Sequence, residues 1–118
     1  MKRALVIDDD PDIAELLRVL LESRGFTVDL FNDGIQAIDL QENYDVILLD
    51  MNMPVFDGER LADYWGITRP ELLARVIVLS GFSAWTHGRT LPIFATVKKP
   101  FDYGHLLRVV EECASAAR

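Results

Sequence analysis

Polar side chains that could perform chemistry stand directly after four short apolar runs of this sequence. They comprise several carboxylates, one hydroxyl and one or two ammonium groups: Asp8, Asp9, Asp10, Asp50, Ser80, Lys98 and Lys99. If Asp8, Asp9 and Asp50 came together, they would repel one another and raise one another's pKa values unless a positive group lay between them. A divalent cation would relieve that repulsion. Mg²⁺ fits best, because it takes one or two carboxylates, keeps waters and leaves positions for phosphate oxygens.

A carboxylate beside Mg²⁺ and a lysine can act as a nucleophile toward a phosphoryl group, which gives an aspartyl phosphate. Phosphoryl transfer needs little beyond in-line positioning and neutralised charge, and the residues above supply both. Each residue also has a purely structural interpretation, because Asp10 suits a helix N-cap, Ser80 suits a turn before Gly81, and a lysine suits a solvated surface. The combination therefore favours phosphoryl chemistry more than any single residue does.

The elements that must position these groups alternate between strands and helices. Five apolar runs rich in Val, Ile and Leu predict parallel strands covered on both faces, over residues 4–7, 26–31, 46–49, 76–79 and 93–97. Helical segments are expected between them, so the pattern predicts a doubly wound α/β sheet. Ligands bind outside the carboxyl ends of the strands in such a sheet, and the polar residues that follow the strands are therefore expected at one edge.

The first helix is the clearest of the predicted helices. Its apolar residues follow the i, i+3, i+4, i+7, i+8 spacing of a helix that buries one face: Ile13, Leu16, Leu17, Leu20 and Leu21. Asp10 is placed to cap this helix, Pro11 suits its first position and Gly25 suits its end.

The other helices are less regular. A second helix is expected after Asn32 or Asp33 over about residues 35–40, a short third over about residues 58–65, and a last from near residue 102 almost to the end of the chain. Residues 80–92 contain two glycines and a proline, so the fourth helix is expected to be short, irregular or partly absent.

Length and composition bound the class of protein. The chain has 118 residues, of which 50% are hydrophobic and 26% charged, so we expect one globular domain over residues 1–118. The formal net charge of −7 argues against direct nucleic-acid binding. The single cysteine, Cys113, cannot form an internal disulfide, and the apolar run at 4–7 is too short for a signal peptide or a membrane span. These features predict a cytoplasmic protein without membrane contact.

Four motifs stand in order at the predicted strand ends: Val6-Ile7-Asp8-Asp9-Asp10; Leu48-Leu49-Asp50-Met51-Asn52-Met53-Pro54 continuing to Asp57-Gly58; Val76-Ile77-Val78-Leu79-Ser80-Gly81; and Lys98-Lys99-Pro100-Phe101. With these motifs the chain resembles a response-regulator receiver domain of two-component signalling, over essentially all 118 residues. The resemblance implies a flavodoxin-like (βα)5 fold whose parallel strands lie in the order 2-1-3-4-5.

The resemblance also implies a role for each matching residue at the acidic edge. Asp50 is the expected phosphoacceptor, and Mg²⁺ is the expected cofactor. Asp9 and Asp50 would hold the ion through their side chains, and Asn52 would hold it through its backbone carbonyl. Asp8 would act mainly through water and by positioning.

Two further matches concern the phosphoryl group itself. Lys99 matches the lysine that contacts the acyl phosphate, whereas Lys98 is expected to face solvent. Ser80 matches the residue whose hydroxyl moves to the phosphoryl group on activation. The Lys99–Pro100 bond is expected to be cis, and Gly58 is expected to have a structural role.

Two features depart from the receiver pattern in the part that meets a target. Thr96 stands where the family usually has an aromatic residue, and Phe94 is expected to point into the core instead. Residues 80–99 are short and broken by glycines where a full fourth helix would lie. We therefore expect phosphorylation to be reported through an unusual rearrangement of residues 81–95. Five aromatic residues either fill the core there or form a patch that a partner covers: Phe82, Trp85, Phe94, Phe101 and Tyr103.

Together these observations predict a phosphoacceptor signalling domain rather than an enzyme. Its expected partners are a histidine kinase or histidine phosphotransfer protein, a downstream protein that binds residues 81–103 and the last helix, and, in a homodimer, a second copy. The main alternative is a scaffold that is not phosphorylated, but such a scaffold would predict loss of an acidic residue or of the lysine, and all are present. An aspartate-nucleophile phosphatase would need a second Asp where Asn52 stands. A flavin carrier would need a phosphate loop where residues 8–10 would repel phosphate.

Overall fold

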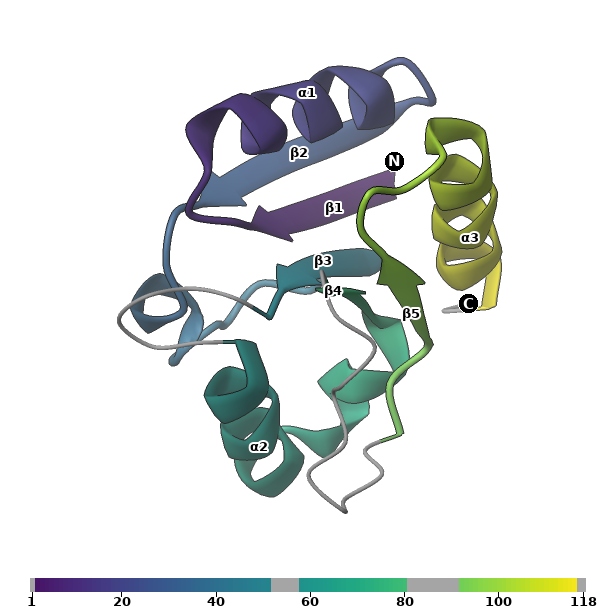
Figure 1. Cartoon of the computed structure of the whole chain (residues 1–118). Coiled ribbons are helices and arrows are strands. Elements are labelled where there is room, and N and C mark those ends of the chain that lie inside the picture. Colours follow the sequence, from purple (N-terminus) through teal and green to yellow (C-terminus); the bar gives the residue numbers. More distant parts are fainter. Residues whose placement is uncertain (1, 52–57, 81–91, 117–118) are drawn as a thin grey trace.

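The computed structural model describes residues 2–51, 58–80 and 92–116, and it shows a parallel sheet covered by helices on both faces (Figure 1). The five strands are β1 (Lys2–Ile7), β2 (Phe26–Phe31), β3 (Val46–Asp50), β4 (Val76–Ser80) and β5 (Ala95–Lys98). They lie in the order β2-β1-β3-β4-β5, which confirms the predicted flavodoxin-like order 2-1-3-4-5. The three central strands are almost wholly buried, which explains why their sequences are continuously apolar.

Alternate residues of each strand supply two separate cores. On one face, Ala4 and Val6 of β1 pack with α1 (Pro11–Glu22) and α3 (Tyr103–Ala116). On the other face, Leu5 and Ile7 pack with α2 (Gly58–Thr68) and the 3₁₀ helices η1 (Ile35–Ala37) and η2 (Pro70–Arg75). Figure 1 shows this division, with α1 and α3 on one side of the sheet and α2 on the other. Packing of these side chains against the helices removes the apolar faces of the sheet from water. The same packing holds the strands, and therefore their ends, in fixed positions.

Helix α1 begins and ends as the sequence predicts. Asp10 accepts hydrogen bonds at its side-chain oxygen from the backbone N–H groups of Asp12 and Ile13, and Pro11 occupies the first helical position. Gly25 follows the helix with φ of +87°, a conformation that a residue without a side chain adopts most readily.

The second predicted helix is wrong in extent, because only the 3₁₀ helix η1 forms where a helix over about residues 35–40 was expected. Three side chains from α2, η2 and the residue between them donate to carbonyl groups in and just after this segment: Trp65 Nε1 to Ala37 at 3.2 Å, Arg69 Nη1 to Leu40 at 2.6 Å and Arg75 Nη1 to Tyr44 at 2.8 Å. The Ala37 carbonyl also accepts the Leu40 N–H at 3.3 Å. These side-chain donors add to the few backbone hydrogen bonds of the segment, so Ala37 and Leu40 are buried with satisfied carbonyl groups and without a regular helix.

The remaining helices differ from the prediction mainly in length. Helix α2 continues to Thr68, beyond the predicted end near residue 65, and η2 begins two residues later at Pro70. The irregular fourth helix predicted within residues 80–92 falls almost wholly on residues 81–91, which lie outside the described part of the chain, as do Phe82 and Trp85. Among the described residues, no helix combines the length and the apolar character needed to cross a membrane.

Candidate functional site

The sheet register brings the predicted polar residues to one edge. Ile7 pairs with Leu49, so Asp8, which follows β1, comes beside Asp50 at the end of β3. Carboxylate oxygens of Asp8, Asp9 and Asp50 lie within 4.8 Å of one another. The structure therefore brings the three carboxylates together, as their positions after the strands predict.

Lys99 adds positive charge to this acidic cluster. Its Nζ donates to Asp50 Oδ1 at 3.1 Å and lies 3.9 Å from Asp8 Oδ2. The backbone N–H of Lys99 donates to the carbonyl of Ser80 at 2.7 Å, which ties the residue to the end of β4. The Lys99–Pro100 peptide bond is cis, as expected.

Asp8 is the carboxyl group of the cluster whose charged form is destabilised by its surroundings. Its side chain is buried; Oδ1 accepts from the backbone N–H of Asp10 at 2.9 Å, whereas Oδ2 has no hydrogen-bond partner among the described residues. Burial, reinforced by the charges of Asp50 and Asp9, raises the pKa of Asp8 to about 6, although the Asp10 N–H and Lys99 act in the opposite direction. A buried oxygen that accepts no hydrogen bond from the described residues, and that lies beside two further carboxylates, is suited to a cation.

The raised pKa of Asp8 predicts a pH dependence of stability in the absence of metal. Because the folded pKa of about 6 exceeds the unfolded value of 3.8, the folded state gains stability from holding the proton at low pH and loses it as pH rises from about 4 to 7. We expect urea unfolding in EDTA to show a loss on the order of 2 kcal/mol over this range. The loss should be absent from Asp8→Asn, and an identical pH profile in the two proteins would contradict the assignment.

The other predicted residues are placed as follows. Asp9 is exposed at the mouth of the cluster, and Ser80 is buried at the end of β4. Lys98 is exposed, as expected, and it pairs with Ser80 in the sheet. Asn52, the predicted backbone ligand, lies outside the described residues.

Of the two features that depart from the receiver pattern, Thr96 is described, whereas most of the stretch over residues 80–99 lies outside the described residues. Thr96 lies on β5 with an exposed side chain. The position that usually carries an aromatic ring in the family therefore has none here. Phe94 is half-buried and packs against the core formed with α1 and α3, which confirms the prediction that it points inward.

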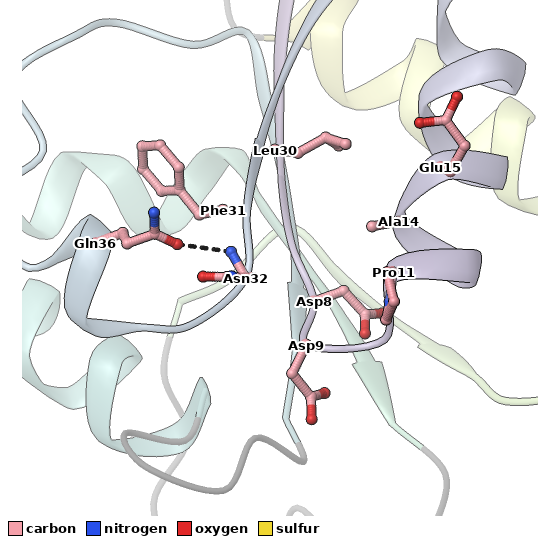
Figure 2. A pocket seen from close by; sticks show the side chains of 9 residues that line it. All are labelled: Asp8, Asp9, Pro11, Ala14, Glu15, Leu30, Phe31, Asn32 and Gln36. Atoms are coloured by element: carbon pink, nitrogen blue, oxygen red, sulfur yellow. Dashed lines mark hydrogen bonds between the residues drawn. The ribbon is translucent and has the colours of Figure 1, made fainter.

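A hollow of about 450 Å³ opens beside the acidic cluster, between α1 and η1 (Figure 2). Its lining joins carboxylates, amides and apolar groups: Asp8, Asp9, Pro11, Ala14, Glu15, Leu30, Phe31, Asn32 and Gln36. Figure 2 shows Gln36 reaching back to Asn32, where Gln36 Oε1 accepts the Asn32 N–H at 2.7 Å. Asp33 Oδ1 in turn accepts the Gln36 N–H at 3.0 Å. The sequence analysis did not predict Gln36 at the site, although an Asp followed three positions later by Gln is a known helix-start signal.

A second hollow, of about 330 Å³, lies on the other side of α1. Ile13, Leu16, Lys99, Pro100, Phe101 and Tyr103 line it. Phe101 and Tyr103, two members of the predicted aromatic patch, contact each other edge to face with ring centroids 5.7 Å apart.

Gly58 is needed because α2 begins directly against the backbone of Asp50. A Cβ atom at Gly58 would lie 2.4 Å from the Asp50 carbonyl oxygen and 2.9 Å from Met51 Sδ. We expect Gly58→Ala to lower the free energy of unfolding by about 1–3 kcal/mol in urea titrations, because α2 or the end of β3 must shift. Gly104→Ala is the matched control. Its Cβ would lie 3.3 Å from Asp102 Oδ1 and meet no backbone atom, so comparable losses in both variants would contradict this explanation.

Comparisons with known proteins agree with this geometry. The family model for the response regulator receiver domain matches residues 4–111. A transcriptional regulatory protein, the CpxR homolog of Haemophilus influenzae, is 44% identical over 59 residues, which cover 49% of this chain and 26% of that protein. The chain therefore matches only about a quarter of the length of such curated relatives.

Solved structures match nearly the whole chain, among them the following two. The receiver domain of the Francisella response regulator 1452 is 28% identical, with a TM-score of 0.87 and 100% coverage of both chains. The response regulator TrrA of Thermotoga maritima, solved in complex with Mg²⁺-BeF, is 29% identical, with a TM-score of 0.84 and coverage of 96% of this chain and 99% of that one.

Proposed function

The chain belongs to the family of response regulator receiver domains, and on that premise we propose that Asp50 accepts a phosphoryl group from a histidine kinase or histidine phosphotransfer protein. An Asp50 carboxylate oxygen attacks phosphorus, and the bond from phosphorus to the donor's histidine nitrogen breaks as the new P–O bond forms. The contact of 3.1 Å between Lys99 Nζ and Asp50 Oδ1, within a cluster of three carboxylates, is the observation that carries this proposal.

Lys99 and Ser80 supply the polar groups around the incoming phosphoryl group. The Lys99 ammonium is already beside the acceptor oxygen, so it can offset negative charge that gathers on the phosphoryl oxygens during transfer. Ser80 ends β4, and its hydroxyl is proposed to donate a hydrogen bond to the phosphoryl group. Both groups come from strand ends that the sheet register fixes, which limits the reorganisation needed during transfer.

The carboxylate cluster fits Mg²⁺. The buried Asp8 Oδ2 has no hydrogen-bond partner among the described residues, and the oxygens of Asp9 and Asp50 lie within reach of the same position. We propose that Asp9 and Asp50 bind the ion through their side chains, Asp8 mainly through water, and Asn52 through its backbone carbonyl. Bound there, Mg²⁺ would neutralise charge on the phosphoryl oxygens.

The electrostatics of Asp8 also speak against a purely scaffolding role. A buried carboxylate with a raised pKa costs stability at neutral pH, and a scaffold gains nothing from that cost. Strongly shifted pKa values cluster at functional sites, and cation binding is the function proposed for this one.

The wider setting of the protein is proposed from the same reasoning. The chain would act in the cytoplasm as one receiver domain over residues 1–118, as a signalling domain rather than an enzyme. A downstream protein, or a second copy, would bind the surface of residues 81–103 and α3, of which residues 92–116 are described.

Intact-mass measurement tests the proposal. The protein is incubated with acetyl phosphate and Mg²⁺, and a parallel sample contains EDTA. We expect a mass increase of one phosphoryl group with Mg²⁺ and none with EDTA, and proteolytic mapping should place the group on Asp50. A protein that gains no mass and binds no beryllofluoride would contradict the proposed function.

A further inference from the structure

Asp10 connects the acidic cluster to helix α1 through three of its polar groups. Its backbone N–H donates to Asp8 Oδ1 at 2.9 Å. Its carbonyl accepts from the Ala14 N–H at 2.9 Å, and its side-chain Oδ1 accepts from the N–H groups of Asp12 at 2.9 Å and Ile13 at 3.3 Å. The residue that caps the helix is therefore also the residue that holds the Asp8 carboxylate.

This arrangement decides which Asp8 oxygen faces the cluster. Rotation about the last bond of an Asp side chain is soft, so the carboxylate needs a fixed donor to hold one orientation. The Asp10 N–H binds Oδ1 and leaves Oδ2 turned toward the charges, 3.9 Å from Lys99 Nζ. The orientation of Asp8 thus depends on where the backbone of Asp10 lies.

We propose that Asp10 is a positioning residue for the cation site: its N-cap hydrogen bonds hold its backbone N–H where it fixes the Asp8 carboxylate. The inference rests on the proposed function, because it concerns the Mg²⁺ site of the phosphoacceptor. Asp10 has the extended conformation of an N-cap, with φ of −88° and ψ of 110°, and the side-chain bonds to Asp12 and Ile13 stabilise it. Loss of these bonds frays the first helical turn and frees the Asp10 N–H to move.

Three variants distinguish the effect of the Asp10 cap on the cation site from the effects of lost charge and of lower overall stability. Asp10→Ala removes the cap and one charge, and Asp10→Asn removes the charge but keeps an oxygen that can cap. Asp102→Ala is the matched control, because Asp102 holds the corresponding place before α3: its Oδ1 accepts from one backbone N–H, that of His105 at 3.2 Å, and its carbonyl accepts from Leu106 N at 2.9 Å. It loses one cap and one charge, as Asp10→Ala does.

The measurements are Mg²⁺ affinity by calorimetry and hydrogen exchange of the residue-10 amide by NMR in EDTA. Outer contacts to direct metal ligands typically change affinity by about 10- to 100-fold, and the lower end applies here because Asp8 is proposed to meet the ion mainly through water. We expect about tenfold weaker Mg²⁺ binding and faster residue-10 exchange in Asp10→Ala. Asp10→Asn and Asp102→Ala should bind Mg²⁺ within about twofold of the wild type, because neither disturbs the donor to Asp8.

Each other result overturns the inference. Equal Mg²⁺ affinity in Asp10→Ala and the wild type would show that the cap does not hold Asp8. Equal weakening in Asp10→Asn would assign the effect to charge, and equal weakening in Asp102→Ala would assign it to general stability. If the wild type itself bound no Mg²⁺, the proposed metal site would fall together with the inference, and this would be evident before any variant was compared.

Discussion

Asp50→Asn is expected to gain no phosphoryl group from acetyl phosphate under conditions that phosphorylate the wild type fully. The substitution keeps the size and shape of the side chain but replaces the attacking carboxylate oxygen by an amide, which is a far poorer nucleophile. The change is all or none, because Asp50 is both the proposed nucleophile and the acceptor. Intact mass at saturating phosphodonor measures it directly.

Asp39→Asn is the matched control for this prediction. It makes the same chemical change and the same change in net charge at an exposed position outside the cluster. We expect it to be phosphorylated like the wild type. A phosphoryl group found on Asp50→Asn and mapped to Asp8 or Asp9 would instead assign the acceptor to a neighbouring carboxylate.

The parts of the site that follow from the sequence are those set by strand ends. Asp8 and Asp50 each come directly after a buried apolar run, and the carboxyl ends of parallel strands share one edge of a sheet. The pairing of Ile7 with Leu49 then leaves little freedom in how the two carboxylates meet. The same argument places Ser80 and Lys99, because β4 and β5 are in register at that edge.

The parts that could not be predicted depend on contacts between distant residues. Nothing local in residues 35–40 shows that Trp65 and Arg69 will donate to the carbonyl groups of Ala37 and Leu40, so the sequence predicts a helix where η1 forms. The sequence likewise does not distinguish the buried Asp8 from the exposed Asp9, since burial depends on what packs around each residue.

Gly58 and Asp10 are intermediate cases, in which a local signal was present but its meaning depended on the tertiary structure. The sequence predicts that Gly58 has a structural role. Only the structure shows why glycine is required: the backbone at the start of α2 approaches the Asp50 carbonyl too closely for a side chain. Asp10 is readable as an N-cap, but its bond to Asp8 appears only when β1 and α1 are both in place. In each, one backbone position serves both the fold and the site.

Lys99→Met is expected to change phosphorylation and Mg²⁺ binding in opposite directions. Methionine keeps an unbranched side chain but removes the ammonium that lies 3.1 Å from Asp50 Oδ1 and 3.9 Å from Asp8 Oδ2. Loss of a group that stabilises developing charge typically slows a reaction by about 100- to 1,000-fold, and we expect that decrease in the rate of mass gain with acetyl phosphate. Mg²⁺ should bind a few-fold more tightly, because no competing positive charge remains beside the carboxylates.

The opposite signs separate a chemical role of Lys99 from damage to the fold, which would weaken both processes. Lys98→Met is the matched control, because it removes the same charge from the neighbouring exposed side chain, and both properties should stay at wild-type levels. Since Lys99 lowers the pKa of Asp8, that pKa should rise further above about 6 in Lys99→Met, which carbon-detected NMR titration of the carboxyl group would measure. Phosphorylation of Lys99→Met at the wild-type rate would show that the ammonium neutralises the resting carboxylates without taking part in transfer.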